Sequence, residues 1–501
     1  MILRSILLIL LASLAFPANA AEWLRAETQH YVIHARLDEA EMRAVAQRAE
    51  EFNRVLHRVL PAQTRPGRKL QLYLEGDETR ISSISDFRNI GWVGIWPETA
   101  TSFSVYDPAE DQLTRSHTLY HALAGNHVEN GFIRPTPPWV AVGVRLFFAT
   151  AYVSEDGYFI LGAPDLKRPM SGSMDTAKLD LILSAESSPR TEHAWKDFSG
   201  WSREALFPML IEPDNAGKLE RYLNAYGEGR SLEDAANELG DLGDWAKQVR
   251  ARQTTRRPTF RRVALEPRTP ASVEIRPMRE DEIALIVLRH ERLRRDRVED
   301  ASRKLANLSE DYPDSALVWA EYAAAEFARV RYAEFGGQVF RGFGFSNGEI
   351  IVTAESYSDA TAWRAVNRAL ELDPELAQAL ELKAEIEMNR LVRTGDLDDA
   401  AAFEDIRRPI AALATDAEQN PLAAALYHQS YVEQGIAPPQ QAVEQLGRAF
   451  VANPGVDAFR YAYAVALSRS GHRDAAELLL TSMLNHPDYR SAAQRALGEA
   501  D

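Results

Sequence analysis

The chain has 501 residues, enough for about three domains of ordinary size. Its composition, 46% hydrophobic and 26% charged, is that of a globular protein. Its formal net charge of −16 argues against nonspecific nucleic-acid binding, so we expect no nucleic-acid partner. The lack of cysteine excludes disulfides, thiol catalysis and cysteine-ligated metals.

Residues 1–20 are typical of a secretory signal peptide. Arg4 supplies the positive charge, residues 6–16 form an apolar stretch too short to span a bilayer comfortably, and Ala-Asn-Ala at 18–20 matches an A-x-A cleavage site. We therefore expect a secreted, periplasmic protein whose mature chain begins at Ala21. It should have no transmembrane segment, because no later stretch approaches about 18 apolar residues. An uncleaved membrane anchor is the alternative.

Residues 21–252 carry both strand and helix signals, which predicts an α+β domain. Alternating apolar residues and β-branched or aromatic side chains predict sheet at 30–35, 69–74 and 91–106. Asp38 can cap a helix that runs to Leu60. A turn at 155–157, flanked by alternating apolar residues, predicts a β-hairpin.

The histidines concentrate in one predicted helix. Three of the chain's eleven are His117, His121 and His127. A proline-rich loop at 132–138 separates this helix from a second one, which opens on Trp139. Two histidines four residues apart share a helix face, as zinc ligands do in an HExxH helix. The same residues also fit ordinary histidines of a helix surface or pocket.

This segment resembles the peptidase MA-like (DUF1570-type) domain of bacterial secreted proteins, a gluzincin-like zinc peptidase. The residues that carry the resemblance are Pro138, Trp139, Gly143, Phe147 and Phe148. A tryptophan before the first predicted strand and a group of helices at 198–250 continue it, so that it covers about half the chain. The resemblance implies a zincin-like α+β fold for residues 21–252.

In that family the first helix carries two histidine ligands and a catalytic glutamate, and the second helix carries a glutamate ligand. The first histidine falls on His121, but the catalytic glutamate falls on Ala122. The second histidine falls on Gly125 and the glutamate ligand on Val142. Loss of a general base alone costs about 10²–10⁴ in rate. The resemblance therefore implies a pseudoenzyme with no catalytic residues, metal or other cofactor.

A second alignment makes His117 and His121 the paired ligands and puts Thr118 at the position of the base. Val142 still replaces the third ligand, and Arg145 on the second helix would repel a cation. A zinc metallohydrolase with this atypical His117/His121 site, completed by a carboxylate from elsewhere, is the alternative function. The sequence does not decide whether the protein is an enzyme, but the replacement of the base and of two metal ligands favours a protein without catalytic activity.

Residues 253–278 have the composition of an Arg/Pro-rich linker, or of short strands separated by prolines, and form part of a basic belt at 250–297. Two interpretations of the belt are open. Its arginines could form a solvated seam paired with acidic neighbours, or they could contact an anionic lipid or polysaccharide.

Residues 279–501 are predicted to be helical, with prolines recurring after helix ends at Pro313, Pro374, Pro421, Pro454 and Pro487. The last two intervals are 33 residues, close to the tetratricopeptide (TPR) period of about 34. Small or apolar residues recur at fixed offsets before these prolines, as Ala442, Leu446 and Ala449 do before Pro454. The pattern resembles TPR repeats and implies an all-α, TPR-type solenoid.

One interval in this region is too long for a single repeat and predicts an insertion near 332–356. Residues 341–345 within it match the start of an RNA-recognition octamer, but the match then fails at Ser346 and Gly348. Helical repeats also lack the four-stranded sheet that presents such aromatic residues to RNA. We expect the insertion to pack on the helical repeats instead.

The sequence as a whole predicts an exported, non-catalytic binding or scaffold protein, in which a pseudo-metallopeptidase domain precedes a TPR protein-interaction solenoid. The concave surface of the solenoid would hold a protein or peptide partner, or another domain of the same chain. Besides the zinc metallohydrolase, a module that binds an envelope polymer through the Arg belt is the remaining hypothesis. Zinc is expected only under the metallohydrolase alternative.

We predict that N-terminal sequencing of the fractionated mature protein will begin at Ala21, because the A-x-A pattern directs cleavage after residue 20. A retained Met1 in the membrane fraction would contradict the signal-peptide interpretation.

Overall fold

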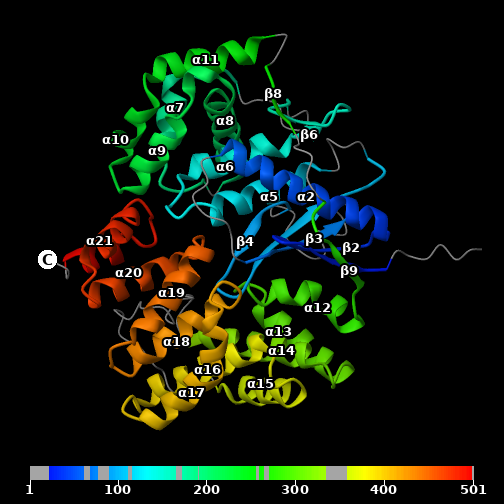
Figure 1. Cartoon of the computed structure of the whole chain (residues 1–501), viewed down its shortest axis with the longest axis vertical. Helices are drawn as coiled ribbons and strands as arrows, with labels where there is room; N and C mark the ends of the chain where they lie inside the picture. Colours follow the sequence, from blue (N-terminus) through cyan, green and yellow to red (C-terminus); the bar gives the residue numbers. More distant parts are fainter. Residues whose placement is uncertain are drawn as a thin grey trace, which may run out of the picture.

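The structure is a computed structural model, and it describes residues 22–60, 68–76, 90–110, 116–164, 172–189, 191–255, 259–264, 270–334 and 358–498. The predicted signal peptide lies outside these residues, as does the predicted insertion apart from 332–334. Figure 1 shows an N-terminal α/β region built on a mixed sheet, followed by a region that is entirely helical.

The main sheet has six strands, and its central strands are parallel. Their order is β4 (Val93–Ile95), β5 (Ala100–Val105), β3 (Leu70–Glu75), β2 (Tyr31–Ala35), β1 (Leu24–Glu27) and β9 (Glu274–Pro277). The pairs β2–β3 and β3–β5 are parallel, whereas β4–β5, β1–β2 and β1–β9 are antiparallel. The strands predicted at 30–35, 69–74 and within 91–106 are therefore all present.

Alternation along the strands sends side chains to two different hydrophobic layers. Leu72 faces the main core, where α2 (Glu39–Val59) and α5 (His117–Asn130) cover the sheet. Its neighbour Tyr73 faces the opposite side and packs with Phe103 and Ile286 of α12 (Glu280–Glu291). The first helix after the α/β region thus closes the second face of the sheet.

Asp38 caps α2 as predicted. Its carboxylate accepts a hydrogen bond from the backbone N–H of Glu41 at 2.8 Å, which satisfies a donor that the first helical turn leaves open. Met42, Ala49 and Phe52 of this helix are fully buried against the sheet, so α2 holds the core on which α5 rests.

The described residues of the α/β region also form α6 (Pro138–Ala149), α7 (Thr176–Leu183), α8 (Glu192–Ile211), α9 (Lys218–Gly227), α10 (Leu232–Ala236) and α11 (Leu242–Thr254). Two 3₁₀ turns, η2 (Pro213–Asn215) and η3 (Asn237–Leu239), lie between them. Gly143 lets α6 approach α8, since a Cβ at this position would lie 2.7 Å from the carbonyl oxygen of Ser202. The predicted hairpin is present as β6 (Tyr152–Val153) and β7 (Tyr158–Leu161).

Two short strands lie within 253–278, the segment expected to be an Arg/Pro-rich linker or to form short strands. Strand β8 (Arg261–Ala264) adds a third strand to the hairpin by pairing with β7, and β9 pairs with β1 at the edge of the main sheet. An edge strand tolerates proline because the backbone N–H groups on its outer side form no hydrogen bonds within the sheet. Pro277 can therefore end β9. The α/β region therefore extends through residue 277.

Arginines of the basic belt find partners within the molecule. Arg262 pairs with Asp156, and Arg276 donates to the carboxylate of Glu282 at 2.6 Å. In the helical region, Arg289 donates to the buried carboxylate of Glu321 at 2.8 Å. These contacts favour the interpretation of the belt as a seam that pairs with acidic neighbours.

The helical region contains α12 and then α13 (Val298–Asp311), α14 (Ala316–Glu334), α15 (Ala360–Leu372), α16 (Ala377–Thr394), α17 (Ala400–Thr415), α18 (Pro421–Glu433), α19 (Gln440–Ala452), α20 (Asp457–Arg469), α21 (Arg473–Ser482) and α22 (Arg490–Gly498). Each helix packs on the next one along the chain. Pro313, Pro374, Pro454 and Pro487 lie in the short turns between these helices, and Pro421 opens α18.

The residues predicted to let paired helices approach are buried. Ala442, Leu446 and Ala449 of α19 are all fully buried. Ala362 and Val366 hold the corresponding positions of α15 and are buried as well. The interpretation of this array as a TPR solenoid stays a prediction.

The helical region also packs along the α/β region, from α12 beneath the sheet to α21 beside α9 (Figure 1). Ile95 and Ile133 of the α/β region pack into the hydrophobic cluster of α18, α19 and α20. Farther along, the side-chain amide of Asn485 donates to the carbonyl oxygens of Tyr226 and Arg230 at 3.0 and 2.9 Å. Among the described residues, no helix is both long and apolar enough to cross a membrane.

Arg460 is the most buried charged residue at this contact, with 2% of its surface exposed. Its guanidinium donates to the carbonyl oxygens of Ile133 and Pro454 at 3.0 Å each, and it pairs with Asp457 at 2.6 Å. One side chain thereby joins the loop after α5 to the turn before α20.

We predict that Arg460→Ala lowers the free energy of unfolding by about 3 kcal/mol, because it removes the donor to two buried carbonyl groups and one of the two partners of Asp457. Chemical denaturation measures this loss. The matched control is Arg448→Ala on the exposed face of α19, which should change stability by less than about 0.5 kcal/mol. Equal effects of the two changes would contradict the role of Arg460 in joining the regions.

Candidate functional site

The histidine helix α5 is buried on nearly all sides, and this explains why its sequence shows no polar face. Leu119, Leu123 and Val128 belong to the main hydrophobic core, and polar residues such as Asn126 and His127 are buried as well. A helix enclosed in this way does not show the division into an apolar and a polar face that is typical of a surface helix. Its partner α6 begins at Pro138, where proline favours the first turn of a helix.

His121 keeps the orientation that zinc-ligating histidines use. Its Nδ1 lies 2.8 Å from the carbonyl oxygen of Gly91. Since a carbonyl oxygen only accepts, Nδ1 carries the proton, and such a bond commonly fixes a ligand imidazole. Gly91 has a positive φ of 76°, and a Cβ here would lie 2.9 Å from the carbonyl oxygen of Thr118.

The space next to His121 is filled by an aromatic ring and a cation. The ring of Trp92 lies edge to face with His121, with 5.2 Å between ring centroids. The guanidinium of Arg145, from α6, stacks over Trp92 at 4.2 Å from the ring centroid. Arg145 is 3% exposed and forms an ion pair with Glu129 near the end of α5.

Gly125, one turn after His121, is the position at which the sequence resemblance places the second histidine ligand. A Cβ at Gly125 would lie 2.9 Å from Nε and 3.4 Å from Cδ of Arg145. Any larger side chain at residue 125 therefore competes with Arg145 for the same space. Burial lowers the pKa of Arg145 to about 9, so the guanidinium is still charged at neutral pH and opposes a metal cation beside it.

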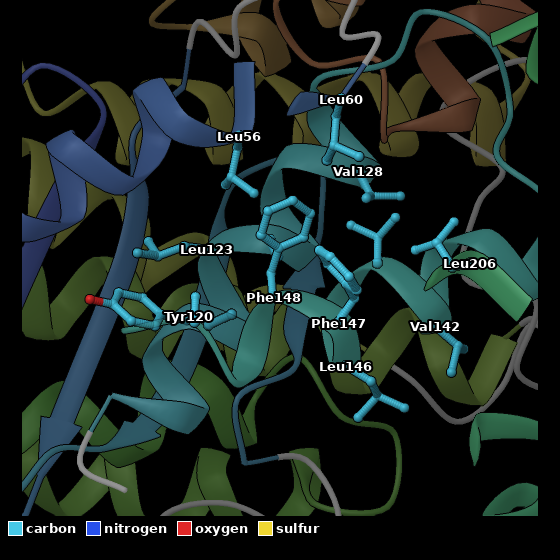
Figure 2. Close-up of a cluster of buried hydrophobic side chains, with 14 of the residues drawn as sticks. Leu56, Leu60, Tyr120, Leu123, Val128, Val142, Leu146, Phe147, Phe148 and Leu206 are labelled. Carbon is cyan, nitrogen blue, oxygen red and sulfur yellow. The ribbon is translucent and has the colours of Figure 1, made fainter. Parts of the chain in front are cut away.

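The remaining two family positions belong to the hydrophobic core. Ala122 is fully buried, and Val142 is 2% exposed. Figure 2 shows Val142 among the buried apolar side chains, which include Leu146, Phe147 and Leu206. A glutamate at either position would place a carboxylate in an apolar environment, where the charged form is disfavoured.

His117 begins α5 and is half-buried. Thr118, which would be the base in the second alignment, instead fastens α5 to the sheet. Its hydroxyl accepts a hydrogen bond from the N–H of Val105 at 2.8 Å and donates to the carbonyl oxygen of the same residue at 2.9 Å. These two bonds give Thr118 a structural role.

His127 lies away from His121 in an apolar environment. It is 1% exposed, and its ring packs edge to face against His57 at 4.6 Å between centroids. Burial, together with nearby His57, lowers the pKa of His127 to about 3. A neutral imidazole held in the core is a packing residue, so the three histidines do not converge on one site.

The sequence identified His121 and His117 as remnant positions but missed Trp92 and Glu129. Trp92 stands in a segment predicted only to form sheet, and nothing in its local pattern indicates contact with His121. The sequence held one indication of this arrangement: Gly125 stands where a histidine ligand was expected, and the next helix carries Arg145. In the part of the chain that the structure describes, His, Asp and Glu side chains form no group of three or more suited to a metal ion.

Comparisons of the chain with models of protein families, with characterised proteins and with solved structures found no match. The function therefore has to be argued from the geometry of the molecule itself.

We predict that Gly125→His destabilises the protein by about 1–3 kcal/mol, because the new imidazole overlaps Arg145. The same substitution in an Arg145→Ala background should cost less, with a coupling energy of about 1 kcal/mol or more between the two sites. Denaturation of the wild type, the two single variants and the double variant measures this coupling. As a control, the effects of Arg448→Ala and Gly125→His on the free energy of unfolding should be additive, because the two residues lie far apart. Additive effects of Gly125→His and Arg145→Ala would contradict the overlap.

Proposed function

We propose that this protein is an exported, non-catalytic binding or scaffold protein, with a pseudo-metallopeptidase domain followed by a TPR-type interaction region. The observation that carries the proposal is the position of Arg145. Its guanidinium takes the space beside Gly125 where the family has a metal ligand, and its charge opposes a cation there.

Two further features support a role without catalysis. The positions of the general base and the third ligand, Ala122 and Val142, are packed in the core, and Thr118 is engaged with Val105. A protein that keeps such a fold while losing its catalytic groups can serve as a stable surface for other molecules.

The partner in this proposal is a protein or peptide held by the inner side of the helical region. The helical region already packs on the α/β region of the same chain, through Ile95, Ile133 and Arg460. The α/β region therefore acts as an internal ligand, and an external partner would bind the surface that the two regions form together.

A zinc metallohydrolase with a His117/His121 site is the second candidate. One observation favours it: the bond between His121 Nδ1 and the Gly91 carbonyl oxygen orients the ring as a ligand would be oriented. Zinc would then need a third ligand, and Arg145 would have to leave its place over Trp92. The first proposal requires neither change.

Elemental analysis of the purified protein, with peptidase assays on the same sample, tests the proposal. We expect zinc well below one equivalent per chain, no change on His121→Ala and no peptidase activity. A variant combining Ala122→Glu, Gly125→His, Val142→Glu and Arg145→Ala should hold more zinc than wild type if the backbone keeps the family geometry. One zinc per wild-type chain, lost in His121→Ala, would overturn the proposal in favour of the metallohydrolase.

A further inference from the structure

A cavity lies where the α/β region meets the helical region. Its volume is about 120 Å³, and its walls come from the turn between β4 and β5, the residues after α12, and helices α14, α16 and α18. A single buried water needs about 10–15 Å³ by a comparable measure, so this space accommodates a small molecule. No residue of the histidine helix lines it.

The cavity has an apolar part. Phe327 and Leu382 are buried residues of facing helices, and Trp96 and Leu422 complete this lining. Arg68 holds the turn that carries Trp96 in place, since its guanidinium donates hydrogen bonds to the carbonyl oxygens of Trp96 and Pro97. The apolar wall is thus built by both regions of the chain and held in place.

The charged part of the lining is mostly paired within the protein. Glu98 pairs with Arg292 at 3.3 Å, and Glu385 pairs with Arg331. Arg292 also forms an ion pair with the buried carboxylate of Glu321. Both arginines of the lining are therefore already neutralised by carboxylates, which makes the cavity a poor site for an anion.

Glu381 differs from the other carboxylates in the cavity. Its Oε1 accepts a hydrogen bond from the backbone N–H of Ala423 at 3.0 Å. Among the described residues, no arginine, lysine or histidine forms an ion pair with it. Arg68 attracts this carboxylate electrostatically without forming an ion pair with it. A half-buried carboxylate with one neutral donor and no ion pair favours a cation, because a charge-assisted hydrogen bond would replace water that it has lost.

We propose that this cavity binds a small primary alkylamine, with its ammonium group facing Glu381 and its aliphatic chain against Phe327 and Leu382. The ring of Trp96 adds further apolar surface for the aliphatic chain. The ligand would contact both regions of the chain and so stabilise their association.

The pKa values of the glutamates in the cavity agree with this proposal. Burial raises the pKa of Glu381 to about 7, with Arg68 opposing the shift, and burial also raises the pKa of Glu385. A cation beside Glu381 favours its ionised form and lowers that pKa. Binding near pH 7 should therefore release part of a proton from the protein.

Isothermal titration calorimetry of the full chain with butylamine tests the proposal, with butanol and butyrate as a neutral and an anionic ligand of similar shape. We expect butylamine to bind with a Kd on the order of 0.1–1 mM and the other two to bind at least tenfold more weakly. Titration at pH 7 in two buffers of different ionisation enthalpy should report the released proton.

Three variants assign the binding to the cavity. Glu381→Gln should weaken butylamine binding about tenfold or more and abolish the proton release. Ala328→Leu, which fills the cavity without changing its charge, should weaken binding to a similar extent. Glu375→Gln removes the same charge from an exposed position on the turn before α16 and should leave binding unchanged.

Circular dichroism of each variant establishes that it is folded. Absence of butylamine binding, tighter binding of butyrate, or unchanged affinity in both Glu381→Gln and Ala328→Leu would overturn the proposal. Zinc content and peptidase activity are separate readouts, so failure of this inference is distinct from failure of the proposed function.

Discussion

The buried guanidinium of Arg145 is the interaction that decides what the histidine helix can do. It pairs with Glu129, stacks on Trp92 and occupies the space that a side chain at Gly125 would need. A buried cation is costly in free energy unless a carboxylate pairs with it. Removing the guanidinium of Arg145 would leave Glu129 without this ion-pair partner and would leave a void over Trp92. The space beside Gly125 therefore holds a structural ion pair.

The same end of α5 connects to the helical region. Gly455, in the turn before α20, approaches the carbonyl oxygen of Glu129 so closely that a Cβ there would lie 2.7 Å away. Arg460 then fastens α20 to the loop that follows α5. The contact between the two regions therefore includes the end of α5, the loop that follows it and helix α20.

Local signals in the sequence were sufficient for most elements. The Asp38 cap, the alternating strands and the proline positions each depend on a few neighbouring residues, and these predictions are confirmed by α2, the main sheet and the turns of the helical region. The position of strand β9 within the proline-rich segment could not be predicted, because an edge strand with prolines lacks the alternation of a buried one. The surroundings of His121 and Glu381 could not be predicted, since Trp92 and Arg68 reach them only through tertiary folding.

X-ray diffraction at the zinc absorption edge, from crystals grown with excess zinc, tests the central claim most directly. The account predicts no anomalous peak beside His121 and a guanidinium of Arg145 stacked over Trp92 against Gly125. An anomalous peak bonded to His121 and to further protein ligands, with Arg145 displaced, would contradict it.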